Sequence, residues 1–179
     1  NDSGRLARWK LDDEGKVQVQ EIAPAFADRR AVTAVAMIHG DASLAVGDDR
    51  GEVTTWFTVR VDDKPTLTRI HTLAEHEGTV REIVASTRNK TLWSLGDNGG
   101  LHWDHMTSQR SLLTLAGTSP LQQFGYSPQG NAVVALDTVG RLTAWRCAAA
   151  HPETSWRTLF GLMHYEGYDQ PAFTWQTTG

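Results

Sequence analysis

One short phrase occurs three times in this 179-residue chain and limits the folds open to it. It reads NDSGRLARW at residues 1–9, DDRGEVTTW at residues 48–56 and DTVGRLTAW at residues 137–145. Each copy has an acid ahead of a glycine, then a polar and an aliphatic residue, and ends in a tryptophan. The fold must therefore repeat one local structure several times along the chain.

The residues around each copy predict short antiparallel strands. Between residues 32 and 57, three apolar groups are separated by HGDAS and GDDRG, which are Gly/Asp turn signals. Residues 79–104 and 121–145 have the same arrangement. We expect a three-strand meander in each unit, with room for a fourth strand. Trp9, Trp56, Trp103 and Trp145 lie 47, 47 and 42 residues apart, and a period in the forties that ends in tryptophan is typical of β-propeller blades.

Each residue of the phrase has a physical reason to be there. Gly4, Gly51 and Gly140 stand where a tight turn requires a positive φ. The acids Asp48 and Asp137 are placed to accept hydrogen bonds from turn amides. The aliphatic residue and the tryptophan are three positions apart, so they point to opposite faces of a strand. Both are buried only if each sheet is covered on both sides.

The units resemble WD-repeats. EHEGTV at residues 75–80 resembles the Gly-His opening of such a repeat, and HWD at residues 102–104 contains a Trp-Asp pair. The resemblance implies an all-β chain of WD-repeat-like β-propeller blades, a partial propeller of about three to four blades over residues 1–150. It also implies that His76 pairs with an acid and a hydroxyl inside its blade.

The units depart from the WD pattern in two respects. The place of His76 is taken by Asp28 in the preceding unit and by Gly117 in the following one. The unit that contains Asp97 and Trp103 lacks one residue between its turn and its tryptophan.

Residues 151–179 contain no further repeat, and we expect a helical tail there. Pro152 and Glu153 suit a first helical turn. Apolar residues at i, i+3, i+4 and i+7 predict a short helix between about residues 153 and 166; they are Trp156, Leu159, Phe160 and Met163. Such a helix would cap the last blade or lie as an amphipathic segment at a membrane surface.

The tail also resembles a second family. LMHYEGYDQPAFTWQTTG looks like the segment before the first transmembrane block in the enlarged permease subunit of gammaproteobacterial phosphate ABC transporters. Those permeases carry a large periplasmic insertion with weak propeller-like repeats. The resemblance implies a periplasmic domain of an inner-membrane protein, with a membrane domain after the tail. The chain starts inside a repeat, without an initiator methionine or a signal peptide, so we expect a piece of a longer protein.

Neither the charge nor the motifs of the sequence favour nucleic-acid binding, a metal site or catalysis. The net charge of -4 gives no footprint for nucleic acid or an anionic membrane, and Cys147 is the single cysteine. LHWDH brings His102, Asp104 and His105 close in sequence, but His105 falls on the opposite strand face. The acid clusters LDDEG, GDDRG and VDDKP read as turns, and no P-loop, Rossmann or nucleophile-elbow motif is present. We expect no enzyme activity, no metal and no cofactor.

Three functions are consistent with these patterns. The first is a noncatalytic accessory or docking domain of a phosphate ABC transporter permease, which supports phosphate uptake across the inner membrane. Its partners would be other transporter subunits and the periplasmic phosphate-binding protein, and two copies could pair edge to edge. The second is a generic WD-repeat-like interaction scaffold of another bacterial protein. The third is an enzyme or ligand-binding propeller with a site on its central axis.

Overall fold

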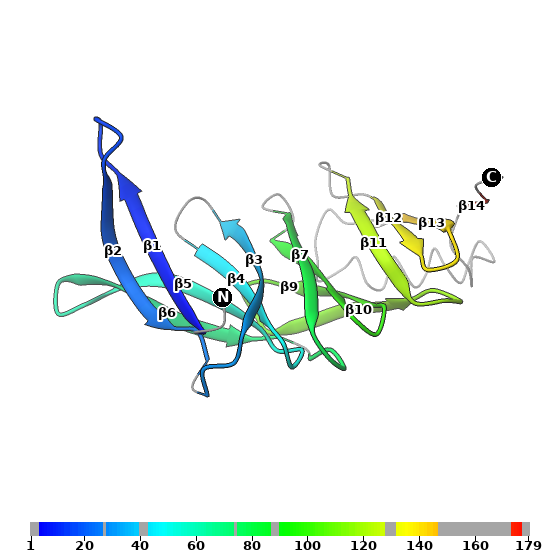
Figure 1. The fold of residues 1–179 in the computed structure, drawn as a ribbon, viewed down its shortest axis with the longest axis horizontal. Coiled ribbons are helices and arrows are strands. Elements are labelled where there is room, and N and C mark those ends of the chain that lie inside the picture. The colour runs from blue at the N-terminus through cyan, green and yellow to red at the C-terminus, as the bar shows by residue number, and fades with distance from the viewer. Residues whose placement is uncertain are drawn as a thin grey trace.

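The computed structural model describes residues 4–26, 28–39, 43–73, 75–86, 90–127, 132–146 and 173–176. Within these ranges the chain is all-β, and it forms one two-stranded and three four-stranded antiparallel sheets. The sheets follow one another in chain order along the long axis of the molecule (Figure 1). The described strands close no ring, and the structure does not show the propeller that the repeats predict.

The strands have the following bounds. The N-terminal hairpin contains β1 (Arg5–Leu11) and β2 (Val17–Pro24). Sheet 1 contains β3 (Val32–His39), β4 (Ser43–Asp48), β5 (Val53–Val61) and β6 (Lys64–Thr72). Sheet 2 contains β7 (Val80–Ser86), β8 (Thr91–Gly96), β9 (Gly100–His105) and β10 (Arg110–Ala116). Sheet 3 contains β11 (Leu121–Tyr126), β12 (Ala132–Asp137), β13 (Arg141–Arg146) and β14 (Phe173–Gln176).

Local turn chemistry explains why each sheet is a meander. The β5–β6 connection has two residues, Asp62 and Asp63, with φ of 48° and 60°. Two successive positive φ values are those of the tight hairpin turn that matches strand twist, and aspartate tolerates them. The cluster VDDKP therefore closes a hairpin, as the sequence predicts.

The sheets pack face to face. We call the side of a sheet that looks toward the N-terminal hairpin its back face, and the opposite side its front face. Residues directly opposed in neighbouring antiparallel strands share a face. The back face of sheet 1 includes Trp56 and Leu44, which pair across β4–β5 and share a core cluster with Leu6 of β1. The front face of sheet 1 includes Val53, which shares a cluster with Leu92 of sheet 2.

A third cluster lies between sheets 2 and 3. It joins the front face of sheet 2, which includes Trp93 and Trp103, to Val133 and Trp145 on the back face of sheet 3. Sheets 1 and 2 are thus covered on both faces, which is the environment expected from the three-residue offset between aliphatic residue and tryptophan.

The tail contains a strand that the sequence pattern did not predict. Phe173–Gln176 forms β14 and pairs antiparallel with β13, so that Ala144 opposes Phe173. This strand is the fourth of sheet 3. The helix predicted between about residues 153 and 166 lies outside the described residues, and nothing in the structure supports it. The described part of the chain contains no helix long and apolar enough to cross a membrane.

Candidate functional site

The glycine of the repeated phrase makes room for the chain that leads into the next sheet. Gly4, Gly51 and Gly140 have φ of 59°, 97° and 84°. A Cβ on Gly51 would lie 2.7 Å from the carbonyl oxygen of Gly78 and would collide with that of His76. A Cβ on Gly4 would lie 2.6 Å from the carbonyl oxygen of Arg30. Only glycine fits these turns, both for its backbone conformation and for the space it leaves.

The acids at positions 48 and 137 organise their turns in the same way. Asp48 Oδ1 accepts from the backbone N–H groups of Arg50 at 3.0 Å and Glu52 at 2.7 Å. Asp137 Oδ1 accepts from those of Val139 at 3.0 Å and Arg141 at 2.8 Å. Each carboxylate satisfies two turn amides that would otherwise lack partners.

Asp97 does not occupy the equivalent place in sheet 2. Its backbone N–H donates to the carbonyl of Thr79 at 2.9 Å, as that of Asp49 donates to Ala31 and that of Thr138 to Pro120. Asp97 therefore corresponds to Asp49 and Thr138, the residues that follow the turn acids. Gly96 has the position that the turn acids Asp48 and Asp137 have in their own sheets. A Cβ on Gly96 would lie 2.7 Å from Nδ1 of His76, so the imidazole fills this space.

Two residues that the sequence patterns missed complete the turn of sheet 2. Asn98 Oδ1 accepts from the backbone N–H of Gly100 at 2.9 Å and so takes over the capping task. Gly99 has a φ of 79° and is the counterpart of Gly51 and Gly140. The two adjacent glycines of GDNGG signal this turn but leave open which of them is the counterpart.

The tryptophans divide into two groups. Trp56 and Trp145 point to the back faces of their sheets and are 5% and 8% exposed. In sheet 2 the matching position is Asp104, which pairs with Leu92 as Trp56 pairs with Leu44. Trp103 comes one residue earlier and so points to the front face.

Trp103 is fully buried and stacks on Trp93, with ring centroids 5.3 Å apart and 4° between the planes. The missing residue of this unit thus moves its tryptophan from the back face to the front face.

A buried histidine cluster lies on the back face of sheet 2. Nε2 of His76 hydrogen-bonds Oγ of Ser94 at 2.7 Å, and its ring stacks on His102 with centroids 3.9 Å apart. Burial, with a smaller contribution from His102, lowers the pKa of His76 to about 4, although the Asp97 charge acts in the opposite direction. The imidazole of His76 is therefore neutral near pH 7 and acts here as a packed, hydrogen-bonded group.

Asp104 shares this face with His102. Burial raises the pKa of Asp104 to about 7, against a smaller lowering by the nearby Ser111 side chain, and neither carboxylate oxygen of Asp104 has a hydrogen-bond partner among the described residues. His105 lies on the other face and its Nδ1 contacts Oγ of Ser108 at 2.7 Å. LHWDH thus splits between two faces, and no group of three or more metal-ligating side chains occurs among the described residues.

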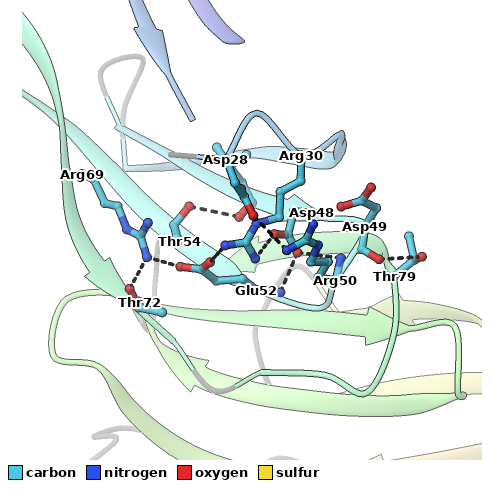
Figure 2. Close-up of polar contacts among 11 residues, drawn as sticks. Asp28, Arg30, Asp48, Asp49, Arg50, Glu52, Thr54, Arg69, Thr72 and Thr79 are labelled. Carbon is cyan, nitrogen blue, oxygen red and sulfur yellow. Dashed lines mark hydrogen bonds and ion pairs between the residues drawn. The ribbon is translucent and has the colours of Figure 1, made fainter. Parts of the chain in front are cut away.

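An ion-pair cluster lies in sheet 1 at the place that the His76 cluster has in sheet 2 (Figure 2). Arg30 joins three carboxylates: its guanidinium lies 2.8 Å from Asp28, 2.7 Å from Asp48 and 3.1 Å from Glu52. The hydrogen bond with Asp28 is the largest cause that raises the pKa of Arg30, and the same bond lowers the pKa of Asp28. The sequence pattern puts Asp28 at the position in this unit that His76 has in the next unit, but it does not predict that Arg30 joins these carboxylates.

Two further arginines complete the cluster. Arg50 pairs with Asp28 at 2.9 Å, and Arg69 pairs with Glu52 and donates to Thr72 at 2.6 Å. Each arginine drawn in Figure 2 is bound to a carboxylate, and the cluster holds as many carboxylates as guanidinium groups. Its cations are therefore engaged in joining the sheet to its preceding connection, and they form no anion site.

Comparison with known proteins bears on the fold alone. No protein-family model matches the chain, and no curated protein matches it in sequence. The chain is similar in structure to the crystal structure of the computationally designed Ika8 protein, at 18% identity and a TM-score of 0.64. The match covers 81% of this chain and 41% of the designed chain, so the chain spans less than half the length of that protein.

Proposed function

We propose that this chain is a run of WD-repeat-like propeller blades that works as a noncatalytic protein-docking domain. The observation that carries this proposal is the joint between successive sheets. The connection into each sheet passes over the turn glycine of the sheet before it, at Gly4, Gly51 and Gly99. Stacked repeats of this kind present continuous edges and faces of the type that protein partners bind.

The polar side chains support docking over catalysis. His76 is engaged with Ser94 and His102, and Arg30 with three carboxylates, so each cluster joins a sheet to the connection that precedes it. A catalytic group needs access to a substrate and a positioned partner. Asp48 and His76 are buried within the stack instead.

We further propose that the parent protein is the enlarged permease subunit of a phosphate ABC transporter, with this domain in the periplasm. The support is the resemblance of LMHYEGYDQPAFTWQTTG to the segment before the first membrane block of such permeases. β14 lies within this segment and pairs with β13. The blades would then be attached closely to the membrane domain, where a docked phosphate-binding protein delivers its substrate.

The test is direct binding between purified components. The chain is immobilised, and the purified phosphate-binding protein of the same organism is titrated over it with and without phosphate. The proposal expects saturable binding of that protein, and no heat of binding when inorganic phosphate alone is titrated into the chain. Micromolar binding of phosphate alone would instead support a phosphate sensor.

The parent gene provides an independent test of the transporter assignment. Several membrane-spanning segments encoded downstream of TWQTTG would support the permease, and another soluble domain there would support the generic interaction scaffold.

A further inference from the structure

The contact between sheets 1 and 2 is packed with smaller side chains than the contacts on either side of it. We call each contact between successive sheets, or between the hairpin and sheet 1, a joint. The joint of the hairpin with sheet 1 contains Trp56, and the joint of sheets 2 and 3 contains Trp93, Trp103 and Trp145. The described core of the joint between sheets 1 and 2 has no tryptophan, and its buried members are aliphatic residues and a methionine. Because large aromatic side chains bury the most apolar surface, this joint is the least strongly packed of the three.

Buried polar atoms without partners weaken the same joint. Asp104 has the tryptophan position of sheet 2 and is fully buried, and neither of its carboxylate oxygens has a hydrogen-bond partner among the described residues. Thr55 lies on the front face of sheet 1, two residues after Val53, and its buried Oγ1 likewise has no partner in the described part of the chain. A polar atom that loses water without gaining a partner destabilises the folded state. Separation of the two sheets would return water to these atoms.

Hydrogen bonds hold the joint at one end. The backbone N–H of His76 donates to the carbonyl of Gly51 at 3.0 Å, and Oγ1 of Thr33 donates to the carbonyl of Val80 at 2.6 Å. These contacts lie beside the Gly51 turn, where β3 and β7 begin. Asp104 lies toward the opposite end of sheet 2, four residues after the start of β9. The joint therefore has an attached end and a weakly packed end.

We propose that this joint is a hinge, at which sheets 1 and 2 separate at the Asp104 end and remain attached beside Gly51. The sheets on either side move as intact units, because each is a four-stranded meander with its own hydrogen bonds. The hinge gives the stack a closed and an open shape, and a partner that binds one shape more tightly would shift the population toward it. The proposal rests on the packing of the sheets and is independent of the docking function.

Cysteine labelling at two buried alanines tests the hinge. Ala45 lies in the joint between sheets 1 and 2 and Ala135 in the joint between sheets 2 and 3, and they are 0% and 1% exposed. Ala45→Cys and Ala135→Cys are made separately in a Cys147→Ser chain, so that each protein has one thiol. The labelling rate in native buffer is divided by the rate in the urea-unfolded chain, which gives a normalised rate that reports how often the joint opens.

The normalised rate of the Ala45→Cys chain should be at least about tenfold higher than that of the Ala135→Cys chain. It should also rise less steeply with urea than global unfolding does, because the hinge exposes only part of the buried surface. Equal normalised rates, or a urea dependence equal to that of global unfolding, would overturn the hinge.

A substitution at Asp104 tests the cause of the opening. Asp104→Leu removes the buried carboxylate and adds apolar contact, so it should slow labelling of the Ala45→Cys chain at least about tenfold. Asp13→Leu is the matched control, because Asp13 is exposed in the β1–β2 turn, and it should leave the rate unchanged. Circular dichroism checks that each variant is folded, and the comparison of the two thiols decides the matter without any change at Asp104. A folded Asp104→Leu chain that labels as fast as the unaltered one would also contradict the proposal.

Discussion

The backbone N–H of His76 donates to the carbonyl of Gly51 at 3.0 Å, while the carbonyl oxygen of His76 occupies the place of the missing Gly51 side chain. The two residues are in different connections, one inside sheet 1 and one between sheets 1 and 2. Their contact fixes where sheet 2 begins on sheet 1. The absence of a side chain at residue 51 is therefore as important to the stack as the hydrogen bond.

Gly51→Ala should destabilise the chain strongly, by about 3 kcal/mol or more, because the methyl group meets backbone oxygens and the φ of 97° is strained for alanine. Gly15→Ala is the control: its φ is 77°, but nothing lies within 4 Å of the added Cβ. Strain alone should cost that variant about 1–2 kcal/mol. Urea unfolding of both variants measures the difference, and equal losses would show that the contact with His76 is unimportant.

Trp56→Ala and Trp9→Ala should differ although the residues occupy the same repeat position. Trp56 is buried and its Nε1 donates to Oγ1 of Thr54 at 2.9 Å, so its loss should cost about 3–5 kcal/mol. Trp9→Ala should cost less than about 1 kcal/mol, because the Trp9 side chain is 55% exposed. Thermal melts at low protein concentration compare the two. A Trp56→Ala chain that melts with the unaltered protein would contradict the sheet 1 packing.

Arg30→Met should be more costly than Arg50→Met. Methionine keeps most of the apolar stem but removes the charge. The Arg30 side chain is 21% exposed and faces the fully buried Asp48, so its loss leaves buried carboxylates without a counter-charge and should cost about 2–4 kcal/mol.

The Arg50 side chain is 66% exposed and, within the described part of the chain, forms an ion pair only with Asp28, so its replacement should cost about 0–1 kcal/mol. Chemical unfolding at low and high salt measures both effects. If the two variants proved equally stable, the Arg30 cluster would contribute nothing beyond an ordinary surface ion pair.

Asp104→Asn should change the pH dependence of stability. The carboxyl has a pKa of about 7 in the folded chain and 3.8 as its reference value, so folding favours its protonated form. That contribution is fully present below about pH 3.8 and is lost as the pH rises to about 7. Across this pH window the free energy of unfolding of the variant should therefore rise relative to that of the unaltered chain, by on the order of 2–4 kcal/mol. Above the window the difference should stay constant. A gain that is independent of pH would rule out titration of Asp104 as its cause.

His76→Gln should also change the pH dependence of the free energy of unfolding, but in the opposite direction from Asp104→Asn. The pKa of His76 is about 4 in the folded chain against a reference of 6.5, so folding favours the neutral ring. Stability from this group is present above pH 6.5 and is lost as the pH falls toward 4, by on the order of 2–3 kcal/mol. The free energy of unfolding is measured at pH 7 and at pH 5 for both proteins. It should fall between these two pH values in the unaltered chain and not in the variant, whatever constant cost the substitution itself has. An equal acid loss in both proteins would assign the effect to other groups.

Much of the local structure follows from the sequence by itself. Turn residues and short apolar groups predict the meander of each sheet, because a turn's backbone conformation depends mainly on its own few residues. The positive φ of Gly51 and Gly140 and the turn amides bound by Asp48 and Asp137 follow from the same local chemistry. The three-residue offset from aliphatic residue to tryptophan also predicts that both faces of a sheet are covered.

The tertiary structure alone decided the relations between distant residues. Matching tryptophans along the sequence puts Trp103 in line with Trp56, but strand pairing puts Asp104 there, because a one-residue shift exchanges the two faces of a strand. The pairing of β14 with β13 and the Arg30 cluster have no local signal either. Strand partners and buried ion pairs are selected by packing between segments far apart in the chain, and a pattern read within a few residues of each position contains no information on that packing.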